Sequence, residues 1–208
     1  MRENNPFHKT AARYDRHLSR PVISTLRRQE AAAVRDLIHT YADKGDTALE
    51  IGPGTGFYTL LLAERVAHVT AIEDSRRMAE ILAGKLAEAE IGNVTVRNQD
   101  FRTLEADHGY DLVMAIGVLD YIPDPQGFIA KMCAAARKAV IFTAPQRGLW
   151  GACFVASNRL RRISVYCHHE GALAQWAPGW RCAIREAGLK TPLTRGLTLI
   201  AALEPDPR

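Results

Sequence analysis

The stretch TALEIGPGTGFYTLLLAERVAHVTAIEDS, residues 47–75, decides the fold of this chain. Its first apolar run, 47–51, leads directly into three glycines spaced two residues apart, at Gly52, Gly54 and Gly56. Glycine tolerates positive φ and has no Cβ, so a ligand can lie directly against its backbone. The stretch therefore predicts a strand, a ligand-binding turn, a helix and a second strand that ends on two acids.

Length and composition set the class of protein. The chain has 208 residues, which is enough for one domain, 1–208, with a sizeable core. No apolar run approaches the roughly 18 residues of a membrane-spanning helix, and the polar segment 1–15 is not typical of a secretory signal. The four cysteines are scattered with no CxxC pair, which favours reduced thiols over a disulfide framework or a zinc site. We therefore expect a cytoplasmic protein that binds no metal.

The positive charges are unevenly distributed. The formal net charge is +4, and residues 1–40 hold eight Lys or Arg against four acids. A second basic cluster is Arg147, Arg159, Arg161 and Arg162. Such clusters attract an acidic substrate, an anionic membrane surface or nucleic acid, although solvated helix faces explain them equally well.

Strand-like and helix-like segments alternate along the chain. Strands are expected at 47–51, 68–73, 93–98, 110–117, 138–145, 190–195 and 197–203. Helices are expected at 21–43, 57–66, 75–90, 125–137 and near 170–187. Alternation of this kind predicts an α/β fold with a doubly wound, mostly parallel seven-stranded sheet, covered by helices on both faces.

The glycine turn distinguishes between two kinds of cofactor. A dinucleotide fingerprint, G-x-G-x-x-G/A, counted from Gly52 would require a small residue where Phe57 stands. Glu50, two residues before the first glycine, would repel a pyrophosphate but would favour a cationic ligand. A nicotinamide-dependent oxidoreductase is therefore the weaker alternative.

With the motif ALEIGPGTGFYT, the chain resembles the class I S-adenosylmethionine-dependent methyltransferases that act on small molecules. The resemblance covers nearly the whole chain in element order and implies a Rossmann-like fold with S-adenosyl-L-methionine as cofactor. It implies that Glu50 and the glycines of the turn, Gly52, Gly54 and Gly56, hold the methionine part of the cofactor. Glu73 would accept hydrogen bonds from both ribose hydroxyls, as a carboxylate can.

The resemblance assigns further cofactor contacts. Asp100 matches the acid that meets the adenine amino group, and Phe101 would pack on the adenine face. Ile116 and Gly117 should approach the cofactor through their backbone. Asp74 is included in the cofactor-binding region, although we expect its side chain to point away from the ribose, toward the next helix.

The catalytic candidates all lie in segments that the family uses to cover the acceptor. Many relatives have a histidine where VLDYIPDP has Tyr121. By resemblance, 1–43 forms an N-terminal helical lid in which Tyr14 closes over the site. The segment 146–168 would be a substrate-cap insertion, and its order FTAP…Y-x-H-x-E, which contains His168, is similar to that of magnesium-protoporphyrin O-methyltransferases. The N-terminal third lacks the signature of those enzymes.

The acceptor class follows from motifs that are missing and from the cap. The sequence has neither the N-P-P-Y or D-P-P-Y motif of base N-methylation nor a Pro-Cys dipeptide, so we expect a small-molecule acceptor and no nucleic acid. In the cap, one apolar face could be formed by Leu149, Trp150, Cys153, Phe154 and Leu160, with Arg159, Arg161 and Arg162 at its end. This pattern suits a hydrophobic, acidic acceptor such as a quinone, tetrapyrrole, lipid or natural-product precursor, or a contact with an anionic membrane. A non-catalytic, cofactor-binding partner subunit remains the other alternative.

Overall fold

The structure is a computed structural model that describes residues 21–105, 109–160, 163–173, 175–187 and 198–207. Its strands are β1 (Thr47–Ile51), β2 (His68–Ile72), β3 (Val94–Arg97), β4 (Tyr110–Ala115), β5 (Ala136–Pro145), β6 (Trp180–Ala187) and β7 (Thr198–Pro205). Its α-helices are α2 (Pro21–Tyr41), α3 (Phe57–Ala63), α4 (Arg76–Glu88), α5 (Pro125–Ala135), α6 (Leu149–Leu160) and α7 (Glu170–Leu173). Two 3-10 turns, η2 (Phe101–Thr103) and η3 (Leu119–Tyr121), follow β3 and β4.

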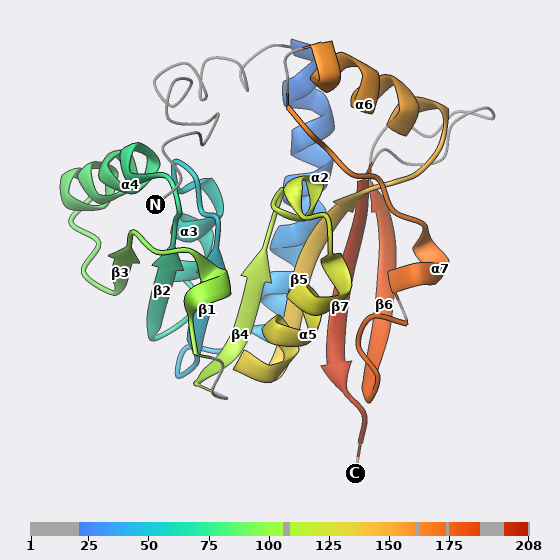
Figure 1. The fold of residues 1–208 in the computed structure, drawn as a ribbon. Coiled ribbons are helices and arrows are strands. Elements are labelled where there is room, and N and C mark those ends of the chain that lie inside the picture. Colours follow the sequence, from blue (N-terminus) through green and yellow to red (C-terminus); the bar gives the residue numbers. More distant parts are fainter. Residues whose placement is uncertain (1–20, 106–108, 161–162, 174, 188–197, 208) are drawn as a thin grey trace.

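The strands form one seven-stranded sheet in the order β3-β2-β1-β4-β5-β7-β6 (Figure 1). All pairings from β3 to β5 are parallel, whereas β7 runs antiparallel to both of its neighbours. The chain order reverses between β1 and β4, and in open α/β sheets ligands bind at such a switch point, outside the carboxyl ends of the strands. The predicted doubly wound, mostly parallel sheet is confirmed.

Apolar residues cover both faces of the sheet because successive strand residues point to opposite sides. One core cluster joins α5 to the face that includes Val113 and Leu199. The other joins α2 and α3 to the opposite face, which includes Leu112 and Ile200. Part of the predicted lid segment thus belongs to the core, through Ala31, Val34, Leu37, Ile38 and Ala42, while residues 1–20 lie outside the described part of the chain.

The prediction of a helix near 170–187 is wrong. The helix α7 ends at Leu173, and β6 forms the edge of the sheet against β7. Pro178 and Gly179 precede β6, and a Pro-Gly pair interrupts a helix. The half-buried side chains of β6, at Trp180, Cys182 and Ile184, recur at every second position, which is the period of a strand. The strand predicted at 190–195 lies outside the described residues.

The cap segment is more regular than its sequence indicated. The helices expected from the sequence include none within 146–168, but α6 accounts for Leu149–Leu160. This helix follows β5 directly and lies beyond the edge of the sheet at which the parallel strands end (Figure 1). The cap is therefore on the side where a switch-point ligand would bind.

Candidate cofactor and acceptor site

The glycine turn adopts the backbone that the sequence predicts. The φ angles of Gly52, Gly54 and Gly56 are 65°, 60° and 93°, a region that residues with a side chain rarely occupy. A Cβ on Gly52 would lie 2.6 Å from Val118 Cγ2, so a side chain there would also displace the loop after β4. The turn therefore brings bare backbone to the carboxyl end of β1.

Glu73 holds the glycine turn in place. Its two carboxylate oxygens accept hydrogen bonds from the backbone N–H groups of Gly54, at 3.0 Å, and Ser75, at 2.8 Å. Ser75 is the N-cap of α4, because its hydroxyl accepts from the Met78 N–H. The same carboxylate was predicted to meet the ribose. That role remains a prediction, and the structure adds a second role that the sequence did not indicate.

Glu50 is a buried carboxyl group whose own partners are incomplete. Only 3% of its surface is exposed, and its Oε2 atom has no hydrogen-bond partner within the described ranges. Its pKa is raised to about 7, mainly by burial; the Thr59 hydroxyl acts in the opposite direction, and the Glu73 charge adds a smaller increase. A buried carboxyl without full pairing is costly, so its place beside the glycine turn indicates a cationic or hydrogen-bond-donating ligand.

The remaining predicted cofactor residues make contacts within the protein. Asp100 caps η2 and forms a salt bridge with Arg102, whereas Asp74 is exposed and does not cap α4. The Phe101 ring is buried and packs edge-to-face on Phe128, with ring centroids 5.0 Å apart. Asp100 and Phe101 remain predictions as adenine contacts.

The loop after β4 lies at the switch point with the glycine turn. Gly117 has a φ of 70°, and its N–H donates to the buried Thr143 hydroxyl of β5 at 2.8 Å. Ile116 is half-buried and packs against the α2 side of the core. These positions agree with the expected approach of this backbone to a cofactor, although no contact with one is shown.

The residues after α6 are fixed onto this loop by backbone hydrogen bonds. The His168 N–H donates to the Pro145 carbonyl, and the Arg147 N–H donates to the His168 carbonyl, both at 2.8 Å. The Tyr166 N–H donates to the Asp120 carbonyl, also at 2.8 Å. Residues 163–168, the return segment, thus bring His168 beside the turn that carries Tyr121. Tyr14 lies outside the described residues.

His168 and Asp120 both have shifted pKa values in this region. Burial lowers the pKa of His168, and contact with the Leu119 backbone acts in the opposite direction. The His168 Nε2 atom is buried without a hydrogen-bond partner in the described structure, and its ring packs edge-to-face on Trp176 at 5.2 Å. A neutral imidazole with a free nitrogen can accept a proton.

Asp120 was missed by the sequence analysis, which considered only its neighbour Tyr121. Burial and, to a smaller extent, the negative charge of Glu30 on α2 together raise the pKa of Asp120 to about 7. Glu30 in turn accepts a hydrogen bond from the Tyr58 hydroxyl at 3.0 Å. An acid that loses its proton near neutral pH at the end of β4 is suited to acid–base chemistry.

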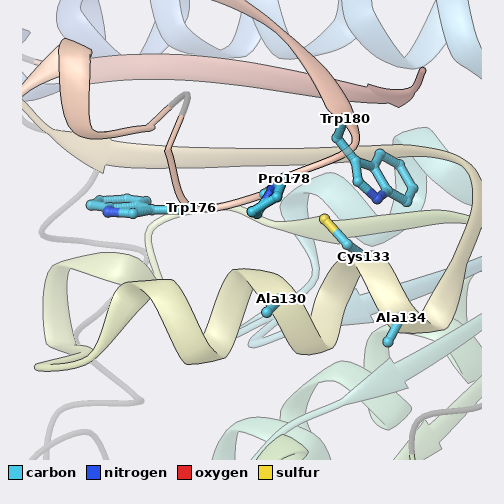
Figure 2. Close-up of a pocket in the computed structure, with 7 residues that line it drawn as sticks. Ala130, Cys133, Ala134, Trp176, Pro178 and Trp180 are labelled. Carbon is cyan, nitrogen blue, oxygen red and sulfur yellow. The ribbon is translucent and has the colours of Figure 1, made fainter.

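A separate apolar pocket of about 220 Å³ lies between α5 and residues 176–180 (Figure 2). Its lining includes Cys133, Trp176, Pro178 and Trp180. Cys133 lies close to the end of α5, next to the start of β5, whereas the glycine turn lies at the opposite edge of the sheet. Most of this pocket therefore lies away from the glycine turn, although the Trp176 ring contacts both the pocket and His168.

Comparison with known proteins decides the family. The family description "Methyltransferase domain" matches residues 42–150, which is just over half of the chain. The chain belongs to the class I S-adenosylmethionine-dependent methyltransferases. The cofactor of this methyltransferase family is S-adenosylmethionine, as predicted, and the buried Glu50 and the bare glycine turn fit such a ligand.

Solved structures agree with the methyltransferase fold over nearly the whole chain. Magnesium protoporphyrin IX methyltransferase from Synechocystis PCC 6803, with bound SAH, gives a TM-score of 0.77 at 19% identity and 96% coverage of each chain. The DhpI-SAM-HEP complex gives 0.67 at 22% identity, covering 96% of this chain and 94% of the other. At these identities the likeness establishes the fold alone.

Curated relatives match a shorter part of this methyltransferase. Ribosomal RNA small subunit methyltransferase A of Mycobacterium avium is 43% identical over 82 residues, 38% of this chain and 26% of that protein. Probable (S)-tetrahydroprotoberberine N-methyltransferase 2 of Papaver bracteatum is 31% identical over 90 residues, 42% of this chain and 25% of that protein. The matches span about a quarter of the length of these relatives.

Proposed function

We propose that this chain transfers a methyl group from S-adenosylmethionine to a small-molecule acceptor bound at the carboxyl edge of the sheet. The observation that carries the proposal is the return segment 163–168, hydrogen-bonded to the loop after β4 and to the end of β5. We infer that this segment forms a second wall of the site from the chain's own residues. Such a wall favours an acceptor small enough to be enclosed.

In the proposed reaction the cofactor supplies an already activated methyl group. The glycine turn and Glu73 would hold it, and the Glu50 carboxylate would stabilise its positive charge. The cap would exclude water and align the acceptor for in-line displacement. An acceptor hydroxyl or amine must lose a proton, and the candidate proton acceptors are Asp120 and His168, together with the tyrosines Tyr121 and Tyr14.

We propose that the acceptor is hydrophobic and carries an acidic group. The matching chemistry lies beside His168, because the Trp176 ring packs on its imidazole and the N–H of the exposed residue Arg147 donates to its carbonyl. Magnesium protoporphyrin IX methyltransferase, which shares the fold, and the Papaver bracteatum relative, a probable (S)-tetrahydroprotoberberine N-methyltransferase, are both named for small-molecule acceptors. These names support the class of acceptor without identifying it.

Ribosomal RNA is the second candidate acceptor, because the Mycobacterium avium relative is 43% identical over its matched segment. That segment is 38% of this chain, and a shared cofactor-binding region explains a match of this size. The base-methylation motifs described above are also absent from the sequence. We therefore favour a small-molecule acceptor and include ribosomal RNA as an alternative acceptor in the assay.

A methyl-transfer assay separates these functions. The purified chain is incubated with cofactor labelled on the methyl group, together with lipid extract, tetrapyrrole and aromatic acids, or ribosomal RNA. We expect label in an organic-soluble small molecule, and none with the variant Gly54→Val, whose φ of 60° disfavours a branched side chain. Transfer of the label to RNA would contradict the proposal of a small-molecule acceptor. Cofactor binding with no labelled product from a complete cell extract would favour the non-catalytic alternative.

A further inference from the structure

One stripe on the outward face of α6 is apolar along the whole length of the helix. Positions 149, 153, 156 and 160 follow the i, i+4, i+7, i+11 spacing of one helix face and carry Leu149, Cys153, Ala156 and Leu160. All four residues are exposed, and 73% of Leu149 and 89% of Leu160 lie open to solvent. Single exposed apolar residues are common, but a continuous stripe of about 18 Å on one helix is not.

The opposite face of α6 packs against the protein. Gly151 is buried, and a Cβ there would lie 2.5 Å from the Gln146 carbonyl oxygen. The Cys167 thiol donates a weak hydrogen bond to the Gly151 carbonyl at 3.6 Å, which ties α6 to the return segment. Val155 is half-buried one turn later. The helix therefore has a fixed orientation, and its apolar stripe faces outward because the inner face is already occupied.

The charged residues that flank the stripe in the sequence are all positive. Between residues 146 and 169 the sequence has four arginines and no Asp or Glu. Arg147 precedes α6 and Arg159 lies in its last turn, and both are exposed. An apolar face whose flanking sequence carries only cations is complementary to a surface with an apolar interior and anionic headgroups.

We propose that the outer face of α6 binds the surface of an anionic lipid bilayer. The leucines would enter the headgroup region while the arginines contact lipid phosphates, and the helix would lie parallel to the surface. Among the described residues, no helix is long and apolar enough to cross a membrane, so the contact would be peripheral. This proposal does not depend on the acceptor, although it would place the carboxyl edge of the sheet near membrane-dissolved molecules.

Vesicle flotation tests the proposal directly. Vesicles of phosphatidylglycerol mixed with phosphatidylcholine are compared with vesicles of phosphatidylcholine alone, at about 0.1 M salt, where charge screening is moderate. We expect binding to the anionic vesicles only. The double variant Leu149→Ser/Leu160→Ser should lower the partition coefficient at least about tenfold, because two apolar anchors are lost. Arg159→Gln should lower it roughly threefold to fivefold, the share of one surface cation.

Two further variants control the test. Arg181→Gln removes an exposed charge on β6, far along the chain from the stripe, and should bind vesicles like the wild type. Ala156→Glu keeps the helix but places an anion in the centre of the stripe, so it should abolish binding even if the double serine variant is poorly folded.

Three outcomes would overturn the proposal. The first is no binding of the wild type to anionic vesicles, and the second is binding that survives both the serine and the glutamate changes. The third is a wild-type dimer in sedimentation velocity that Ala156→Glu dissociates without any vesicle binding, since the stripe would then contact a second copy of the chain. Binding of S-adenosylhomocysteine, measured on each variant, reports the cofactor site separately.

Discussion

Replacing Glu50 with Gln should stabilise the ligand-free protein and weaken cofactor binding at the same time. Glu50 is buried and its Oε2 atom lacks a partner in the described structure, and burial raises its pKa from 4.5 to about 7. A shift of this size corresponds to about 3 kcal/mol of unfavourable free energy once the group is ionised. A residue that binds a ligand can destabilise the ligand-free protein by this amount, whereas a residue with a purely structural role should not destabilise the fold.

The pH dependence of this effect has a definite sign. Because the folded-state pKa is raised, the folded protein binds the Glu50 proton more tightly than the unfolded chain does. The stabilisation is complete below pH 4.5 and is lost as the pH rises to about 7, so stability falls across this window. Glutamine cannot ionise. The variant should therefore lack this part of the pH dependence and be about 1–3 kcal/mol more stable than wild type at pH 8, allowing for the unpaired amide.

Urea unfolding at pH 5 and pH 8, followed by tryptophan fluorescence, measures the stability difference. Asp120 also titrates near neutral pH, but it is present in both proteins, so the difference between them isolates Glu50. Calorimetry at pH 8 should show S-adenosylmethionine binding weakened at least about tenfold in the variant, the loss expected for one hydrogen bond to a charged group. At pH 7, wild-type binding should release about half a proton, detectable by comparing phosphate with Tris buffer.

The opposite pattern would refute this reasoning. If Glu50→Gln is less stable than the wild type at pH 8 and binds the cofactor equally well, then Glu50 supports the fold and does not serve the ligand. If affinity falls but stability falls with it, the loss of binding could come from a distorted turn.

Three other changes test neighbouring parts of the site. Gly52→Ala should lower the free energy of unfolding in urea by about 1–3 kcal/mol, because the new Cβ would clash with Val118. Adding Val118→Ala should recover part of this loss, and no recovery would show that backbone strain at the positive φ causes it. Glu73→Ala should weaken S-adenosylhomocysteine binding by about 2–4 kcal/mol in calorimetry. Glu73→Gln should also weaken it, because the side-chain amide cannot accept through both of its polar atoms from the Gly54 and Ser75 N–H groups. A larger loss of affinity in Asp74→Ala than in Glu73→Ala would contradict this assignment. Asp120→Asn should lower kcat about a hundredfold and remove a rise in kcat near pH 7, whereas an unchanged pH profile would exclude Asp120 as the proton acceptor.

Local sequence patterns predicted the part of the fold that depends on local geometry. The strand at 47–51, the glycine turn and the start of the next helix are consecutive in sequence, so their spacing alone defines the cofactor turn. The strand β6 was missed because its alanine and charged residues also suit a helix. Its state is decided by pairing with β7, which is a tertiary effect.

The acceptor side of the site could be predicted only in part. Tyr121 and His168 were identified from motifs, and backbone hydrogen bonds bring their segments together. The effect of Glu30 on Asp120 joins α2 to the loop after β4, and no sequence pattern indicates that proximity. The second role of Glu73, as a fixed partner of the Gly54 N–H, likewise depends on how two loops meet after folding.

The most direct test of the central claim is a calorimetric titration of the wild-type chain with S-adenosylhomocysteine, with NADH titrated under the same conditions. We predict one site per chain with a dissociation constant in the micromolar range for S-adenosylhomocysteine, lost in Gly54→Val, and no heat with NADH. Binding of NADH alone, or S-adenosylhomocysteine binding that persists unchanged in Gly54→Val, would contradict the assignment of the glycine turn as the site of the methyl donor.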